Sequence, residues 1–141
     1  MTTVPYIHTI QYYETDRMGI THHSNYVRFM EEARIDFFKQ LGWDYAKLES
    51  LGIVSPVTKI DCQYKVPTTF GDELRITVIV KECSGIRIQL MYKMVNQRGV
   101  VCCTANSEHC FVTGEGKIVR VDKDFPDFYQ CIKEKTDEHS M

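Results

Sequence analysis

YYETDRMGITHHSNY, residues 12 to 26, is a polar stretch between an alternating N-terminal segment and the longest amphipathic run of the chain. Five residues close together in this stretch carry groups or backbone geometry suited to chemistry: Asp16, Gly19, His22, His23 and Tyr26. We interpret the stretch as a catalytic loop that leads into the start of a helix. The remaining sequence has the pattern of a sheet that would hold this helix.

The pattern after the loop predicts one long helix, from about Asn25 to Leu41. Its apolar residues recur at spacings of three and four, which places them on one helical face: Tyr26, Phe29, Met30, Ala33, Phe37 and Leu41. Gly42 is a suitable residue to end this helix. A shorter helix is expected from Asp44 to Ser50, with Gly52 closing it.

Alternation of apolar and polar residues predicts strands before and after these helices. The expected strands cover residues 4 to 12, 57 to 66, 73 to 81, 86 to 94, 100 to 112 and 117 to 121. Tight turns between most of them indicate an antiparallel sheet. A final short helix is expected from Phe125 to Lys135, with Pro126 near its first position.

These elements together predict an α+β protein in which a curled antiparallel sheet wraps around one long central helix. With 141 residues in all, residues 1 to 135 are expected to form a single domain and residues 136 to 141 a flexible C-terminal tail. Ile79 and Met91 leave apolar surface on the outer face of the sheet. This surface favours self-association, most simply as a homodimer.

The overall charge argues against two classes of partner. The formal net charge is -2, so neither nucleic acid nor an anionic membrane surface is indicated. No apolar run is long enough to span a bilayer. The first residues lack the basic and apolar regions of a signal peptide, so a cytoplasmic location is expected.

Disulfides, metals and cofactors are not expected. The chain has six cysteines but no C-x-x-C motif, and thiols in the cytosol stay reduced. A metal site built from Asp16, His22 and His23 would need a further ligand from a distant part of the chain, and the sequence presents no clear candidate.

A set of residues matches the pattern of one known family: Tyr13, Thr15, Asp16, Gly19, His23, Tyr26, Glu31, Ala33, Arg34, Tyr64, Pro67, Gly71, Asp72, Leu74 and Ala105. On these residues the chain resembles the hotdog-fold acyl-CoA thioesterases, in particular the group of 4-hydroxybenzoyl-CoA thioesterase and the YbgC-like enzymes. The likeness spans roughly residues 5 to 125. Its most specific part is Asp16 to Tyr26, because spacing, loop position and the following helix agree.

The resemblance implies a hotdog fold, a homodimer or homotetramer, and hydrolysis of an acyl-CoA thioester. It implies that Asp16 is the catalytic carboxylate and that the backbone N–H of residue 23 receives the thioester oxygen. His23 matches the histidine of the YbgC-like subgroup. The chain departs from the family pattern at Arg17-Met18 and at His22. These residues border the expected acyl pocket, so the departures bear on the choice of substrate.

Thioester hydrolysis requires a nucleophile and a group that stabilises the oxyanion. The start of a helix has unpaired N–H groups and about half a positive charge, and one such donor can contribute about 10²–10³ in rate. Asp16, ionised at neutral pH as a free aspartate is, could attack directly or deprotonate a water. Gly19 would allow close approach to the backbone, and His23 would position water or assist the departing thiolate.

Three further side chains are expected to contact the substrate: Met18, His22 and Tyr26. The position of the helix start decides whether the His23 N–H is free. Ser24 is a good N-cap by propensity, and it would leave His23 just outside the helix. If Thr21 caps instead, the His23 N–H lies in the first turn and is free to donate. The family pattern favours the second arrangement.

Other functions on the same fold stay open. One is a dehydratase or hydratase acting on acyl thioesters, for which the expected helix motif is not found. Another is a non-catalytic acyl-CoA-binding domain, since a fold alone does not give a function. For Asp16, the alternative role is a turn residue that stabilises the loop through an Asx-type bond.

Overall fold

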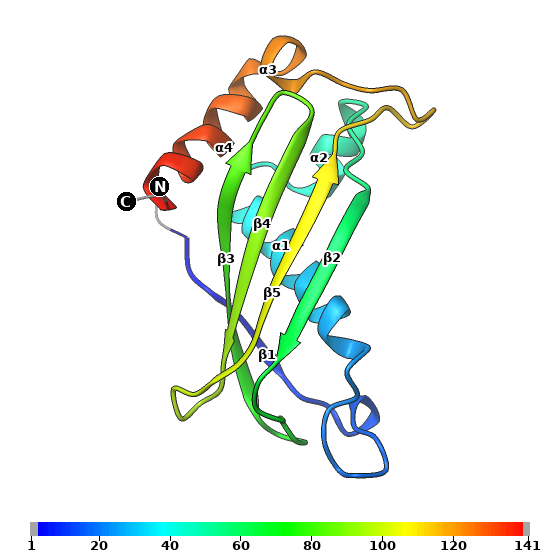
Figure 1. The fold of residues 1–141 in the computed structure, drawn as a ribbon. Coiled ribbons are helices and arrows are strands. Elements are labelled where there is room, and N and C mark those ends of the chain that lie inside the picture. The colour runs from blue at the N-terminus through cyan, green and yellow to red at the C-terminus, as the bar shows by residue number, and fades with distance from the viewer. Residues whose placement is uncertain (1–2, 140–141) are drawn as a thin grey trace.

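One antiparallel sheet with the strand order β1-β3-β4-β5-β2 is the framework of the protein in this computed structural model, which describes residues 3–139 (Figure 1). The strands are β1 (Tyr6–Thr9), β2 (Val57–Tyr64), β3 (Glu73–Cys83), β4 (Arg87–Val95) and β5 (Val101–Cys110). Every neighbouring pair is antiparallel. The order places β1 and β2 at opposite edges, so the segments on either side of α1 (Asn25–Gln40) flank the sheet.

The helix α1 lies against one face of the sheet, as Figure 1 shows. It is accompanied by a 3-10 turn η1 (Tyr12–Glu14) and by α2 (Tyr45–Ser50), α3 (Val121–Asp124) and α4 (Pro126–His139). The predicted α+β architecture, a curled sheet around one central helix, is therefore confirmed. This arrangement is the hotdog fold.

The core forms between the predicted apolar face of α1 and alternate positions of the strands. Phe29, Met30 and Ala33 are fully buried or nearly so. On β3 the burial alternates strictly from Leu74 to Val80, because successive strand residues point to opposite faces. The helix start, and with it the polar loop before it, is thus fixed against the sheet by apolar packing.

Several sequence-based boundaries differ from those in the structure. The strands expected over residues 57 to 66 and 100 to 112 end at Tyr64 and Cys110. The first strand ends at Thr9 rather than at residue 12, because the chain turns into η1. Residues 117 to 121 form no strand: Ile118 makes one isolated bridge, and α3 begins at Val121. The tail predicted from residue 136 is helical as far as His139. Thr136 is buried there, and its hydroxyl donates to the Ile132 carbonyl at 3.1 Å. Residues 140 and 141 of that tail lie outside the described residues.

A polar chain crosses the core between α1 and the sheet. Arg34 Nε donates to the Tyr45 hydroxyl and Arg34 Nη1 to the Tyr92 hydroxyl, both at 3.0 Å. The Tyr92 hydroxyl contacts Ser107 Oγ at 2.8 Å, and Ser107 Oγ lies 2.8 Å from Nε2 of His109. Hydrogen bonds of this kind satisfy polar groups that would otherwise be costly to bury.

His109 makes the stability of the fold sensitive to acid. Burial, and next the positive charge of Arg34, lower the pKa of His109 from 6.5 to about 4. Between these values the unfolded chain binds a proton that the folded chain does not bind. The free energy of unfolding is therefore expected to fall by about 3 kcal/mol as the pH falls through this window. Urea unfolding at a series of pH values measures this loss.

A matched pair of variants isolates the contribution of His109. His109→Asn removes the titrating group and is expected to flatten the dependence of stability on pH in this window. Gln63→Asn, at an exposed residue that does not titrate, is expected to leave the dependence as it is in the wild type. An unchanged dependence in His109→Asn would contradict the assignment.

Candidate active site

Asp16 is held in a tight turn of the loop. Its backbone N–H donates to the Ile20 carbonyl at 2.8 Å, and the Gly19 N–H donates to the Asp16 carbonyl at 3.0 Å. One carboxylate oxygen, Oδ1, accepts the Met18 N–H at 2.8 Å. The Asx-type bond considered as an alternative role is therefore present. It occupies Oδ1, while Oδ2 accepts no hydrogen bond from residues 3–139.

Gly19 shapes the turn rather than the cavity. Its φ is +81°, a left-handed conformation that favours glycine over residues with a side chain. Its carbonyl accepts the Thr69 hydroxyl at 2.8 Å. A Cβ at this position would meet no atom within 4 Å. Gly19 therefore serves the backbone conformation of the loop, and the close approach expected at this residue stays a prediction.

Ser24 is the N-cap residue of α1, which leaves His23 just before the helix, but its side chain makes no capping bond. Thr21 is turned away, with its hydroxyl 2.6 Å from that of Thr68. The His22 carbonyl accepts the Asn25 N–H at 3.0 Å, and His22 Nδ1 accepts the Ser24 N–H at 3.2 Å. His22 therefore supplies the side-chain acceptor at the helix start.

This arrangement leaves the His23 N–H unused within residues 3–139. His22 before it donates its own N–H to the Glu14 carbonyl at 2.8 Å, and Ser24 after it is bonded to His22 Nδ1. The unpaired donor lies at the N-terminal end of α1, where the helix dipole adds partial positive charge. An anionic or strongly polarised oxygen is the partner that such a donor attracts.

A cavity of about 330 Å³ lies between this loop and the end of β2. Its lining residues come from both segments: Asp16, Met18, Ile20, Thr21, His23, Tyr26, Tyr64, Lys65, Val66 and Pro67. Four of the six predicted site residues, Asp16, Met18, His23 and Tyr26, are therefore brought together. Gly19 and His22 are not part of the lining.

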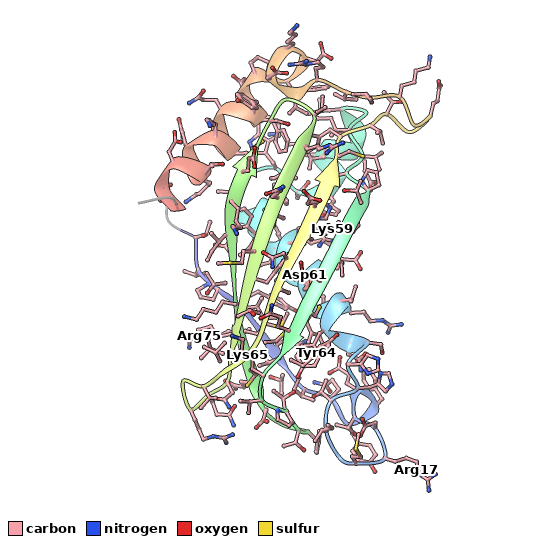
Figure 2. All side chains as sticks on the ribbon, in the orientation of Figure 1. Arg17, Lys59, Asp61, Tyr64, Lys65 and Arg75 are labelled. Atoms are coloured by element: carbon pink, nitrogen blue, oxygen red, sulfur yellow. The ribbon has the colours of Figure 1, made fainter. Side chains whose placement is uncertain are left out.

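Gly19 and His22 neighbour the lining residues in the loop, whereas the Arg17 side chain points away from the loop (Figure 2). The His22 ring is exposed and stacks on that of His23, with centroids 4.3 Å apart. In Figure 2 the Arg17 side chain extends outward from the loop, whereas Tyr64 and Lys65 lie together at the end of β2. Of the two residues that depart from the family pattern before Gly19, only Met18 lines the cavity.

The wall contributed by the end of β2 was not predicted as part of the site. Tyr64 and Pro67 were noted only as matches to the family, because nothing local places them beside the loop. Two tyrosine hydroxyls make the connection: Tyr64 donates to the His23 carbonyl at 3.3 Å, and the Tyr26 hydroxyl lies 3.0 Å from that of Thr68. The signal in the sequence is Pro67, which predicts that the strand ends nearby; the strand in fact ends at Tyr64.

The tyrosines that face the cavity are neutral at physiological pH. Burial raises the pKa of Tyr64 to about 12 and also raises the pKa of Tyr26. Both hydroxyls can donate or accept hydrogen bonds, but neither can act as a base at neutral pH. Within residues 3–139 there is no group of three or more metal-ligating side chains, nor a helix that is both apolar and long enough to cross a bilayer.

A model of the thioesterase-like superfamily matches residues 10–130. The chain belongs to this superfamily. Solved structures agree: a crystal structure of a DHNA-CoA thioesterase from Staphylococcus aureus aligns with a TM-score of 0.88 and 30% identity, covering 93% of this chain and 89% of that one. The predicted hotdog fold and the predicted enzyme class, a thioester hydrolase, are confirmed by this membership.

Two relatives at the level of sequence are informative. A Bacillus subtilis (strain 168) protein provisionally named acyl-CoA thioesterase YneP is 34% identical over 125 residues, which cover 88% of this chain and 91% of that protein. A 1,4-dihydroxy-2-naphthoyl-CoA hydrolase of Thermosynechococcus vestitus is 31% identical over 105 residues, which cover 74% of this chain and 72% of the hydrolase. The chain therefore aligns with most of the length of each relative.

Proposed function

We propose that this protein hydrolyses an acyl-CoA thioester to the free acid and CoA. The observation that carries the proposal is the pairing, on one cavity, of the Asp16 carboxylate with the unused N–H of His23. The first is a base or nucleophile, and the second is an oxyanion donor. The names of the two sequence relatives support CoA as the thiol component of the substrate.

In this proposal the thioester carbonyl oxygen accepts the His23 N–H. Asp16 either deprotonates a water that attacks the carbonyl carbon, or attacks through Oδ2 to give an acyl-enzyme anhydride that water then cleaves. In both routes the C–S bond breaks and CoA leaves as a thiolate, so a strong general acid is not required. The Asx bond at Oδ1 supports this role, because it orients the carboxylate while Oδ2 stays available.

The cavity wall suits the acyl group. Met18, Ile20, Val66 and Pro67 are apolar, and Tyr26 presents a buried ring. Lys65 lies at the same wall and is exposed, so it can meet an anionic part of the substrate at the cavity mouth. The proposal therefore covers both aromatic and aliphatic acyl groups, and a substrate panel distinguishes them.

The test is release of free thiol from a panel of aromatic and aliphatic acyl-CoAs and acyl-carrier-protein thioesters. Release from at least one acyl-CoA is expected. Binding of acyl-CoA with no release from any thioester would contradict the proposal and favour a non-catalytic binding domain. Addition of water to an enoyl-CoA, with the thioester bond intact, would favour a hydratase function instead.

We also propose that the chain forms a cytoplasmic homodimer through β2. This strand ends the sheet and pairs only with β5 among the described residues, so one row of its backbone groups is available for a further strand. The cavity lies at the end of the same strand. The six cysteines are free, which supports a reducing compartment.

Sedimentation equilibrium tests the proposed assembly. The mass is expected to equal that of two chains, or of four if dimers pair through the outer face of the sheet. A mass of one chain across the micromolar range would contradict the proposal. Because the test does not depend on substrate, its outcome is independent of the assay of hydrolysis.

A further inference from the structure

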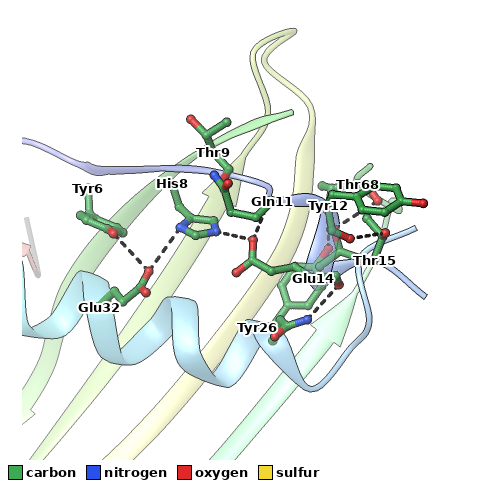
Figure 3. Close-up of polar contacts among 12 residues, drawn as sticks. Tyr6, His8, Thr9, Gln11, Tyr12, Glu14, Thr15, Tyr26, Glu32 and Thr68 are labelled. Carbon is green, nitrogen blue, oxygen red and sulfur yellow. Dashed lines mark hydrogen bonds and ion pairs between the residues drawn. The ribbon is translucent and has the colours of Figure 1, made fainter. Parts of the chain in front are cut away.

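Glu14 carries a buried carboxylate that does not line the cavity. Glu14 is 6% exposed and lies two residues before Asp16. Its Oε1 accepts the backbone N–H of Gln11 at 2.7 Å and lies 2.9 Å from Nε2 of His8 on β1 (Figure 3). A buried carboxylate requires such partners, because an unpaired one would be costly.

His8 faces a second carboxylate with its other nitrogen. Nδ1 lies 3.3 Å from Oε2 of Glu32 on α1, and the same oxygen accepts the Tyr6 hydroxyl at 3.1 Å. The His8 ring packs on Phe29, with centroids 4.2 Å apart. His8 therefore faces Glu14 with one ring nitrogen and Glu32 with the other, and it links β1 to α1 and to the loop.

The backbone of Glu14 carries this connection to the reacting groups. Its carbonyl accepts the His22 N–H at 2.8 Å and the Asn25 side-chain amide at 2.9 Å. His22 directly precedes His23, and Asp16 follows Glu14 by two residues. One residue is therefore bonded to β1 through its side chain and to His22 and Asn25 through its backbone carbonyl.

We propose that His8 and Glu14 are positioning residues, and that their contact sets the separation between the Asp16 carboxylate and the His23 N–H. We name this contact the Glu14 tether. The inference rests on the proposed function and adds two residues to it, neither of which touches the substrate. A displacement of about 1 Å in such a site can cost about 10² in rate, so the tether acts on kcat rather than on substrate binding.

Two variants at Glu14 separate positioning from charge. Glu14→Ala removes the acceptor and is expected to lower kcat by about 10²-fold, with KM little changed. Glu14→Gln keeps Oε1, the atom that makes both contacts, and is expected to restore much of the lost kcat. Glu49→Ala, at an exposed glutamate on α2, is the matched control and is expected to keep the wild-type kcat.

Two variants at His8 repeat the test from the other side. His8→Leu is expected to lower kcat, and His8→Gln, which can still donate to Glu14, is expected to recover part of it. In the Glu14→Ala background, His8→Leu is expected to have little further effect, because both changes break one contact. Fully additive losses in kcat would overturn the tether, as would a wild-type kcat in Glu14→Ala.

Amide hydrogen exchange supplies a readout that needs neither substrate nor a stable Glu14→Ala protein. In His8→Leu, faster exchange is expected at the His22 N–H, with the core strands unchanged, whereas Glu14→Gln is expected to exchange near the wild-type rate. Equal exchange at His22 in the wild type and His8→Leu would overturn the inference. If the wild type releases no thiol from any acyl-CoA, the proposed function fails, whereas the exchange result still decides whether the tether exists.

Discussion

Asp16→Asn is expected to lower kcat for acyl-CoA hydrolysis by about 10²–10⁴-fold, because the amide is neither a base nor an effective nucleophile. The substitution is conservative for the fold. Asparagine keeps the Oδ1 acceptor, so the bond from the Met18 N–H and the turn that it closes are retained. Thiol release at saturating acyl-CoA measures kcat, and KM is expected to stay near the wild-type value because the substrate contacts remain.

Two further variants distinguish loss of the Asp16 carboxylate from loss of structure. Asp127→Asn changes an exposed aspartate at the start of α4 and is expected to leave kcat unchanged. Asp16→Ala removes the Asx bond as well as the charge, so it is expected to be at least as inactive and also less stable. Wild-type turnover by Asp16→Asn would assign Asp16 to the loop structure alone.

Phe29→Ala is expected to lower the free energy of unfolding by about 3–5 kcal/mol. Phe29 is fully buried, and its ring packs between His8 at 4.2 Å and Tyr26 at 5.4 Å. The loss would be a large fraction of the total for a domain, which is about 5–15 kcal/mol. Urea unfolding followed by circular dichroism measures the change.

The matched control lies on the same helix. Val27 is 40% exposed, and Val27→Ala is expected to change stability by less than about 0.5 kcal/mol. If Phe29→Ala lost no more than the control, the ring would not be a core element, and the packing that supports the His8 contact would have to be reassigned.

Local periodicity was sufficient to predict most of the fold. The apolar face of α1 and the alternation of β3 both reflect burial against one layer, which is a local property of the sequence. The segment from 117 to 121 alternates too, but its pairing with residues 111 to 113 amounts to one isolated bridge and two backbone bonds in the described part of the chain, which is too little for a strand. The tail beyond residue 135 is polar in composition, yet Thr136 packs inward on α4.

The site was predictable only in part, for a physical reason. Asp16 and His23 lie in one motif, so their common location could be expected from sequence. The side-chain acceptor supplied by His22 could not, because intrinsic preference favours the Ser24 hydroxyl, and the bond from the His22 N–H to the Glu14 carbonyl holds His22 in place. Tyr64 could not be assigned to the site from the sequence either, because a tertiary contact brings it to the loop.

The attachment of the loop to residues 68 and 69 also has a consequence for the order of assembly. The hydroxyls of Thr21 and Thr68 meet across 47 residues, and the Thr69 hydroxyl reaches Gly19 across 50. During synthesis the N-terminal part of a chain emerges first, so the loop exists before its anchors have been made. Contacts between such distant residues form late, because closing long loops costs entropy. The proposed site is therefore a late product of folding, and a nascent chain that has yet to expose residue 69 carries Asp16 and His23 without the assembled loop.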